Sequence, residues 1–206
     1  MARKLNNDRA LRIIAAARDE FAQRGFDGAR VERIARQAGV NKQLLFYYYH
    51  SKRGLFHAVL SGGAQELELA LARSTSGGGA LGGGGGGPLE RLRATLAAQF
   101  DFLAANPDLV TLLTQAGRSH ARPFAPAINR LVVLLAEGQG LGEVRDDVDP
   151  HLVAAQALVL MVAYLGLEPL IAASAAPLGG DEPALARRWK EAAVRLVIAG
   201  VRAPPG

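Results

Sequence analysis

The stretch VERIARQAGVNKQLLFYYYH, Val31 to His50, decides the fold of the N-terminal third of this chain. It contains two short helical stripes of apolar residues separated by a tight turn. Ala35, Gly39 and Leu45 follow the spacing A-x3-G-x5-L. Alanine permits close contact between crossing helices, glycine permits a left-handed turn, and leucine fills the space between the helices. The spacing predicts a helix-turn-helix, although the short pattern alone is common in alanine-rich chains.

The residues after the turn indicate what the second helix does. In a helix-turn-helix, the second helix enters the DNA major groove with its N-terminal end first. Asn41 is the predicted N-cap, which places Lys42 and Gln43 in the first turn, where both can hydrogen-bond base edges or phosphates. Ser51 is the predicted N-cap of the next helix, whose free backbone N–H groups suit a DNA phosphate. Nearby basic residues can neutralise phosphate charge: Arg30, Arg33, Arg36, Lys52 and Arg53. We interpret Arg33 and Arg36 as solvated helix surface rather than direct DNA contacts.

The rest of the chain has helical periodicity and little sustained alternation, so the predicted fold class is all-α. Leu11, Ile14, Ala17 and Phe21 form the apolar stripe of a first helix that stops near Gly25. Further helices are predicted at 51 onward, 89–105, 107–118, 123–138, 150–174 and 183–201.

A glycine-rich tract divides the chain. The sequence STSGGGALGGGGGGP, Ser74 to Pro88, predicts a flexible loop because ordering so many glycines is entropically costly. The predicted boundaries are a helix-turn-helix domain at 1–60, a linking helix and loop at 61–88, and a helical body at 89–206. Gly62 and Gly63 lie inside the linking helix, where we expect a weakened or kinked segment.

Charge is concentrated in the N-terminal part. Residues 1–73 carry 13 Lys and Arg against 7 Asp and Glu, within a chain of net charge +5. This imbalance favours contact between the first part and a polyanion. Charge alone does not distinguish that reading from basic residues on solvated helix faces.

Enzyme signatures are missing from the sequence. There is no cysteine, the four histidines form no H-E-x-x-H pair, and no G-x-S-x-G motif occurs. The glycine tract lacks the G-K-[ST] ending of a phosphate-binding loop. We therefore predict no catalytic residue, no metal site, no cofactor and no enzymatic activity.

The location of the protein follows from two further features. No apolar run with a cleavage site follows the basic N-terminus, so we expect no secretory signal, and the lack of cysteine fits a reducing cytoplasm. The most lipid-like window is Ala157–Ala176, but Glu168 and Pro169 lie near its middle. We interpret it as a buried helix rather than a membrane span, and we expect a cytoplasmic protein without a membrane partner.

The segment Ile13 to Leu60 resembles the N-terminal DNA-binding domain of TetR-family transcriptional regulators. The resemblance rests on F-A-x-R-G-F at the end of the first helix, then I-A-x-x-A-G-V, then an L-[FY]-x-x-[FY] block followed by S-K and L-F. It implies an all-helical homodimer, in which a three-helix DNA-binding domain joins a C-terminal effector-binding and dimerisation domain. Most members of the family are repressors that a small ligand releases from operator DNA.

Carried over position by position, the resemblance implies a set of DNA-facing residues: Lys42, Gln43, Leu44, Phe46, Tyr47 and Tyr48, with Lys52 as a phosphate contact. It implies that Tyr49 packs in the core. Ala29 occupies a position that often holds a threonine capping the second helix, so we expect Gly28 or Asp27 to start that helix. Leu44 stands where a small or hydroxylated residue is usual, which implies an apolar contact such as a thymine methyl.

The body carries no fixed motif. The resemblance implies that its last two helices pair across a two-fold axis as a four-helix bundle, and that two DNA-binding domains read half-sites of a pseudo-palindromic operator about one helical turn apart. Candidate contacts for an unknown small-molecule effector are aromatic or polar residues of the body helices: Phe100, Gln115, His120, Phe124, Met161 and Tyr164. Two alternatives stay open, an activator of the same fold and a helical ligand-binding or scaffold protein without specific DNA binding.

Overall fold

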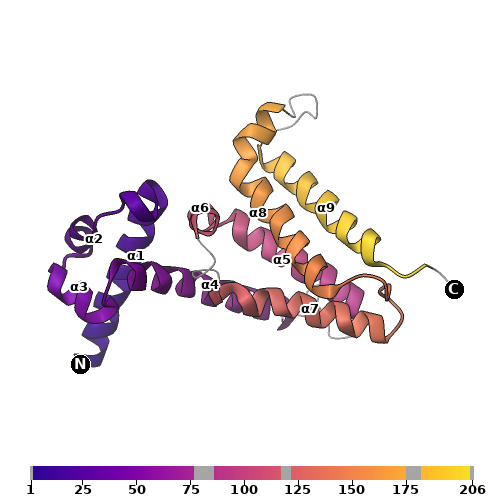
Figure 1. Cartoon of the computed structure of the whole chain (residues 1–206), viewed down its shortest axis with the longest axis horizontal. Coiled ribbons are helices and arrows are strands. Elements are labelled where there is room, and N and C mark those ends of the chain that lie inside the picture. Colours follow the sequence, from indigo (N-terminus) through magenta and orange to yellow (C-terminus); the bar gives the residue numbers. More distant parts are fainter. Residues whose placement is uncertain (1, 77–85, 117–121, 175–181, 205–206) are drawn as a thin grey trace. The chain divides into compact units, whose positions relative to one another are not determined.

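A computed structural model describes residues 2–76, 86–116, 122–174 and 182–204. The helices in chain order are α1 Ala2–Gly28, α2 Val31–Ala38, α3 Lys42–Tyr49, α4 Lys52–Ser76, α5 Pro88–Ala104, α6 Pro107–Gln115, the short 3-10 helix η1 Arg122–Phe124, α7 Ala125–Gly140, α8 Pro150–Ser174 and α9 Glu182–Val201 (Figure 1). Within these ranges the extended pairing is an isolated antiparallel bridge between Val144 and Arg202. The predicted all-α fold is confirmed. The predicted glycine-rich loop falls mostly outside the described residues.

The chain forms two compact units. One unit, here called the head, comprises Met1–Gln65 and Asp108–Pro123, and the other, the body, comprises Glu66–Pro107 and Phe124–Gly206. The sequence boundaries assigned 108–123 to the body. The contacts of α6 group this stretch with the head instead.

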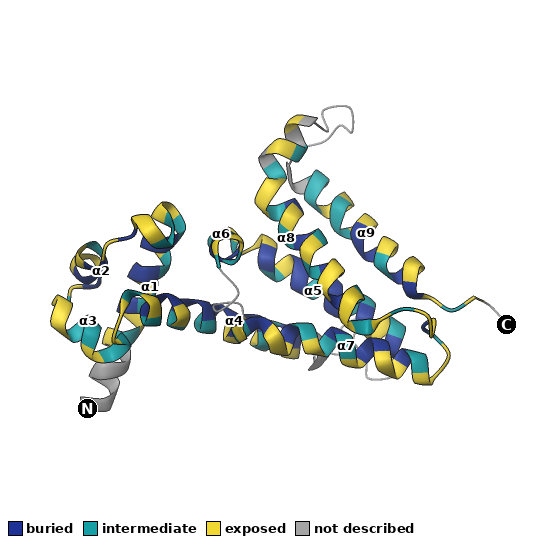
Figure 2. Ribbon diagram, viewed as in Figure 1, coloured by how far each residue is buried: buried dark blue, intermediate teal, exposed yellow. Residues whose placement is uncertain are grey.

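The head is built on an apolar core shared by α1 to α4. Ile13 and Phe21 of α1, Ile34 of α2, Leu45 of α3 and Phe56 of α4 are all almost completely buried. Figure 2 shows buried segments along α1, α2 and α4. The rings of Phe21 and Phe56 meet edge to face with centroids 5.0 Å apart, a favourable aromatic geometry. These contacts hold α1 to α4 of the head in one arrangement.

Two glycines with positive φ set the helix boundaries of the head. Gly25 has φ 70° and ψ 172°, which interrupts α1 where the sequence predicted its end. Gly39, the residue after α2, has φ 65° and ψ 38°, and its N–H donates to the carbonyl of Arg36 in the last turn of that helix. Both conformations are inexpensive for glycine and costly for other residues. The predicted tight turn of the helix-turn-helix is confirmed.

The expectation of a kink at Gly62 and Gly63 is wrong. Helix α4 runs through both glycines, and neither has a positive φ. A Cβ placed on Gly63 would lie 2.6 Å from Leu109 Cδ1 of α6, whereas one on Gly62 would meet open space. Gly63 therefore serves the close approach of α6 to α4 within the head rather than a break in the helix.

The body packs α5 against α7 and α9, and α8 against α7 and α9 (Figure 1). The N-terminus of α5 is closed by a residue distant in sequence, because Glu143 Oε2 accepts a hydrogen bond from the Leu89 N–H at 3.0 Å. The segment containing Glu143 is joined to the end of α9, since the Arg145 N–H donates to the Val201 carbonyl at 2.9 Å. A carboxylate of the chain thus occupies the helix end that follows the glycine tract, a position that favours anions.

Candidate DNA-binding surface and body core

Helix α3 is anchored at both its N-terminus and its centre. The Leu44 N–H donates to Asn41 Oδ1 at 2.7 Å, so the predicted N-cap is confirmed. Leu45 is fully buried and fixes the rotation of the helix about its axis. The seven predicted DNA-facing residues then divide into two groups. Lys42, Gln43 and Tyr47 are exposed, and Leu44, Phe46, Tyr48 and Lys52 are half-buried.

The three consecutive tyrosines differ in environment. Tyr47 is 76% exposed, and its ring meets that of Tyr48 edge to face with centroids 5.5 Å apart. Tyr49 is half-buried rather than in the core, because it is the last residue of α3 and its hydroxyl reaches the Ala10 carbonyl of α1 at 3.4 Å. Burial, with a smaller contribution from Tyr48, raises the pKa of the Tyr49 hydroxyl. Tyr48 and Tyr49 are both half-buried, so Tyr49 is a peripheral contact rather than the predicted core residue, and the DNA-facing role of Tyr47 and Tyr48 stays a prediction.

The turn between α3 and α4 places Lys52. His50 adopts φ 61°, an unusual value for a residue other than glycine, and Ser51 caps α4 by accepting from the Gly54 N–H at 2.9 Å. The predicted Ser51 cap is therefore confirmed. Lys52 Nζ donates to the Asp27 carbonyl at 3.1 Å and lies 4.9 Å from the centroid of the Phe26 ring. These contacts hold the ammonium group beside the segment that leads into α2.

Lys42 has an acidic partner that sequence reasoning missed. Its Nζ lies 2.6 Å from Glu32 Oε1 of α2. The hydrogen bond from Lys42 is the main cause of a lowered Glu32 pKa. Both side chains are exposed, so the pair is weak. Ten residues separate the two across the turn, a spacing with no recognised sequence signal.

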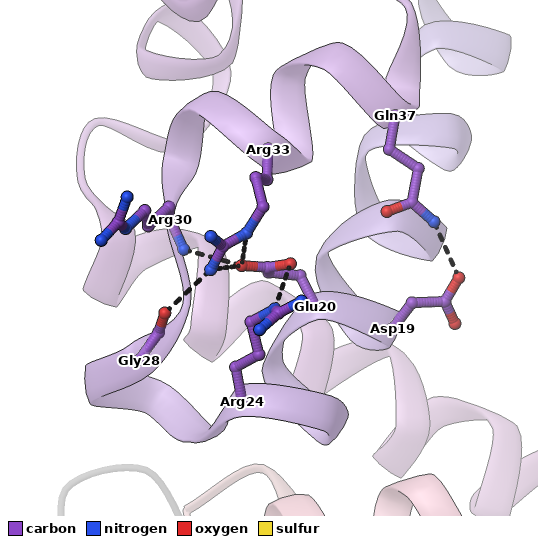
Figure 3. A network of polar contacts seen from close by, with 7 residues as sticks. All are labelled: Asp19, Glu20, Arg24, Gly28, Arg30, Arg33 and Gln37. Carbon is purple, nitrogen blue, oxygen red and sulfur yellow. Dashed lines mark hydrogen bonds and ion pairs between the residues drawn. The ribbon is translucent and has the colours of Figure 1, made fainter.

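The start of α2 differs from the prediction. The helix begins at Val31 with Arg30 as the N-cap residue, not at Asp27 or Gly28, because Arg30 is extended with φ −121° and ψ 125°. Arg30 supplies no side-chain cap. Instead Glu20 of α1 accepts the Arg30 N–H on Oε1 at 2.9 Å (Figure 3).

Glu20 is the centre of a polar network between α1 and α2. It is only 6% exposed, and the same Oε1 accepts Arg33 Nε at 2.7 Å. Arg33 also donates to the Gly28 carbonyl at 3.1 Å, and Arg24 pairs with the second Glu20 oxygen at 3.5 Å (Figure 3). Burial opposes ionisation of Glu20, but the hydrogen bonds from Arg33 and the Arg30 amide outweigh it and lower its pKa. The interpretation of Arg33 as solvated surface is therefore wrong.

In the body, the structure brings together part of the predicted effector set. The rings of Phe100 and Tyr164 stack with centroids 6.0 Å apart, and Tyr164 stacks on Trp189 at 4.5 Å. Phe100, Phe124, Met161 and Tyr164 are all buried. Gln115 is an exposed residue of the head unit, and His120 lies outside the described residues. Sequence reasoning missed Trp189, although a single tryptophan in an apolar helical pattern was a usable signal.

Two surface hollows follow the seam between α5 and α9. They measure about 400 and 320 Å³, and Lys190 lines both. Phe100 lines the smaller hollow, and Lys190 pairs with Asp101 at 2.8 Å on its rim.

Comparison with known proteins finds a family model for the N-terminal part of the chain and another for the C-terminal part. The family model described as "Tetracyclin repressor-like, C-terminal domain" matches residues 88–197, more than half of the chain, and "Bacterial regulatory proteins, tetR family" matches residues 13–59. This chain belongs to the TetR family. It is accordingly a DNA-binding transcriptional regulator, and the family resemblance of the sequence is confirmed.

Similar TetR-family proteins include a curated relative and two solved structures. The HTH-type transcriptional repressor SCO4008 of Streptomyces coelicolor is 32% identical over 159 residues, which cover 74% of this chain and 73% of the relative. The putative transcriptional regulator SCO4942 of Streptomyces coelicolor has a TM-score of 0.71 and 31% identity, covering 94% of this chain and 98% of its own. The regulator FadR of Bacillus subtilis, solved in complex with stearoyl-CoA, has a TM-score of 0.69 and 19% identity over 93% and 99% of the two chains. The last similarity concerns the fold.

Proposed function

We propose that this TetR-family protein is a repressor that binds a pseudo-palindromic operator as a homodimer and is released by a small molecule. The observation that carries the proposal is α3 itself. It is capped by Asn41, anchored by Leu45, and presents Lys42, Gln43 and Tyr47 to solvent in a basic head. A short, rigidly anchored helix with polar residues in its first turn suits the DNA major groove.

In this proposal the residues of α3, together with Lys52 of α4, make different contacts with DNA. Lys42 and Gln43 read base edges or bind phosphates from the first turn, and Leu44 contacts a thymine methyl. Phe46, Tyr47 and Tyr48 contact the sugar-phosphate backbone beside the groove. Lys52, held beside Asp27, binds a phosphate and carries no sequence information.

A homodimer is supported by the apolar face of α8. Within the described residues, Pro150–Glu168 is a segment long and apolar enough to cross a membrane, with a mean hydropathy of 1.7, yet only 22% of it is buried inside this chain. The exposed residues recur every three or four positions along one side: Leu152, Ala155, Val159, Ala163, Leu167 and Leu170. Such a stripe suits pairing with a second helix. A second copy of α8, together with exposed Leu196 of α9, would cover it as a four-helix bundle.

Release by a small molecule is supported by the composition of the body and by the path of the chain. The stack of Phe100, Tyr164 and Trp189 offers an apolar, aromatic environment of the kind that ligand sites use. FadR of Bacillus subtilis shares the fold and was solved with stearoyl-CoA. Helix α6 follows α5 directly and belongs to the head, where Asp108 forms an ion pair with Arg18 of α1. A ligand that moves α5 would therefore act on the head through α6.

Selection of bound sequences from genomic DNA, followed by fluorescence anisotropy, tests the proposal. We expect one palindromic sequence to be enriched and its affinity to fall steeply with salt. Lys52→Ala should weaken binding to all duplexes, whereas Gln43→Ala should change sequence preference. If the parent binds no duplex even at low salt, the protein is a scaffold rather than a regulator. If both variants bind every duplex as the parent does, the assignment of α3 is wrong.

A reporter gene placed under the selected operator decides the direction of regulation. Because SCO4008 is a repressor with 32% identity, we expect lower reporter expression when the protein is present. Higher expression would identify an activator. Analytical ultracentrifugation of the purified chain should show a dimer.

A further inference from the structure

We propose that Glu20 caps α2 from outside the helix, and that the N-cap position this releases carries a phosphate-binding arginine, Arg30. The inference rests on the proposed DNA-binding function of the head. It assigns a positioning role to Glu20 and adds a DNA contact beyond those carried over from the family.

The N-cap residue of α2 provides no side-chain cap of its own. In a capping box, a Ser or Thr at the N-cap binds the N3 amide, and a Glu or Gln at N3 accepts the N-cap N–H. In α2 the N-cap is Arg30 and N3 is Arg33, so neither side chain can accept a hydrogen bond. Glu20 of α1 supplies the missing acceptor, because its Oε1 receives the Arg30 N–H at 2.9 Å and Arg33 Nε at 2.7 Å.

The cap depends on the Glu20 carboxylate, the Arg33 side chain and the backbone N–H of Arg30. Arg33 is a cation in the first turn of α2, where the helix dipole disfavours positive charge, and the carboxylate that it binds neutralises it. Glu20, which would be costly to bury as an ion, is satisfied by Arg33 and by the Arg30 amide. Each residue compensates for the other, and together they fix α2 against α1.

The side chain of Arg30 takes no part in this cap. A hydroxyl at the N-cap would accept the N3 amide, but in α2 the Arg33 N–H donates to the Arg30 carbonyl at 3.0 Å instead. Position 30 therefore carries no capping hydroxyl, and the residue there is exposed. Figure 3 shows its guanidinium directed away from Glu20, while that of Arg33 points into the network. Within the network drawn in Figure 3, the bond of Arg30 is made by its backbone N–H, and, beside the hydrogen bond from Lys42, its charge makes a small contribution to the lowered pKa of exposed Glu32.

Its position in the segment before α2 places Arg30 among the proposed DNA-facing groups of the head. Lys52, the family's phosphate contact, is bonded to the Asp27 carbonyl at 3.1 Å, three residues before Arg30. The same segment ends at the N-terminus of α2, and the first helix of a helix-turn-helix crosses the DNA backbone. The amide of the N-cap is already occupied by a carboxylate, which disfavours a second anion there. A phosphate at this end of α2 is therefore bound by the Arg30 side chain and Lys52.

The salt dependence of DNA affinity tests the assignment of Arg30. Each phosphate contact contributes about 0.9 to the slope of log affinity against log salt concentration. We expect Arg30→Ala to lower the magnitude of the slope by about one, on the selected operator and on an unrelated duplex alike. The matched control is Arg36→Ala, which removes the same charge from an exposed position on the same helix. An unchanged slope in Arg30→Ala, or equal changes in both variants, would overturn the assignment.

A rescue experiment tests Glu20 separately. Glu20→Ala should increase hydrogen exchange of the α2 amides in the full chain and weaken binding to operator. Adding Arg30→Ser supplies a residue that caps its own helix, so exchange in α2 should return toward that of the parent. The slope should nevertheless stay about one lower than the parent's, because serine carries no positive charge. If Glu20→Ala leaves hydrogen exchange of the α2 amides unchanged, Glu20 is not the cap.

The experiments distinguish failure of the proposed DNA-binding function from failure of the roles given to Glu20 and Arg30. If the parent protein itself shows no salt-dependent binding to DNA, the proposed function is wrong. If the parent binds and these variants do not behave as stated, the function stands and the roles of Glu20 and Arg30 are wrong.

Discussion

Alanine substitution at the adjacent glycines of α4 should have opposite effects on stability. Gly62→Ala places a methyl group in open space, and replacing glycine by alanine inside a helix stabilises it by about 0.5–1 kcal/mol. Gly63→Ala places the same methyl 2.6 Å from Leu109 Cδ1 and 3.1 Å from Cδ2. Carbon atoms in contact normally lie about 3.5–4.0 Å apart. The new methyl therefore overlaps Leu109 by about 1 Å.

Leu109 has little room to move because it is fully buried. Overpacking of a filled core costs about 1–3 kcal/mol, and the gain in helix propensity of about 0.5–1 kcal/mol offsets part of it. We expect Gly63→Ala to destabilise the head by about 1 kcal/mol net, and the two variants to differ by about 2 kcal/mol.

Hydrogen exchange of the peptides spanning 52–65 and 107–116 measures this difference within the head, where a single unfolding transition of the two-unit chain would average it. Protection should rise in Gly62→Ala and fall in Gly63→Ala. The double variant Gly63→Ala with Leu109→Val should recover part of the loss, because the smaller side chain makes space. Equal stabilisation by both alanines would show that Leu109 does not pack on Gly63.

Three further predictions concern charge and assembly. Glu32→Gln should strengthen binding to all duplexes about two- to five-fold in anisotropy at low salt, because it frees Lys42 and removes a negative charge near DNA; unchanged affinity would show that the pair does not compete with DNA. Folding lowers the pKa of Glu20 from 4.5. The ionised carboxylate therefore stabilises the folded state above pH 4.5, and this contribution is lost as the pH falls through the folded-state pKa. Unfolding free energies of the parent and Glu20→Gln should therefore converge below pH 4.5, and a constant difference would contradict the cause given. Val159→Glu on α8 should dissociate the dimer in ultracentrifugation, whereas Val133→Glu, at an exposed position on α7, should not; a dimer in both variants would place the interface elsewhere.

Local features of this protein could be predicted from the sequence because they depend on residues close together in the chain. Asn41 and Ser51 each cap a helix by accepting a hydrogen bond from the amide three residues ahead. Gly25 and Gly39 end helical segments through their own backbone conformation. The family motif between Ile13 and Leu60 indicated the DNA-binding head on the same local basis. Such interactions need no knowledge of the remaining fold.

The errors arose where a distant residue decided the local structure. The start of α2 depends on Glu20, ten residues earlier, which replaces the cap that Ala29 and Arg30 cannot form. Gly63 looked like a hinge from helix propensity, but its role is set by Leu109 of α6. In both cases a tertiary contact outweighed the intrinsic preference of the residue.

By itself the sequence determined an all-helical regulator with a capped recognition helix, since periodicity, caps and turn glycines are encoded within a few residues. The tertiary structure alone decided which basic residues stay exposed. Arg30 and Arg33 lie three residues apart in a helical segment and look equivalent in the sequence. Burial of Glu20 beneath α2 draws Arg33 into an ion pair and leaves Arg30 at the surface, because a buried carboxylate must be neutralised by the nearest cation that can reach it.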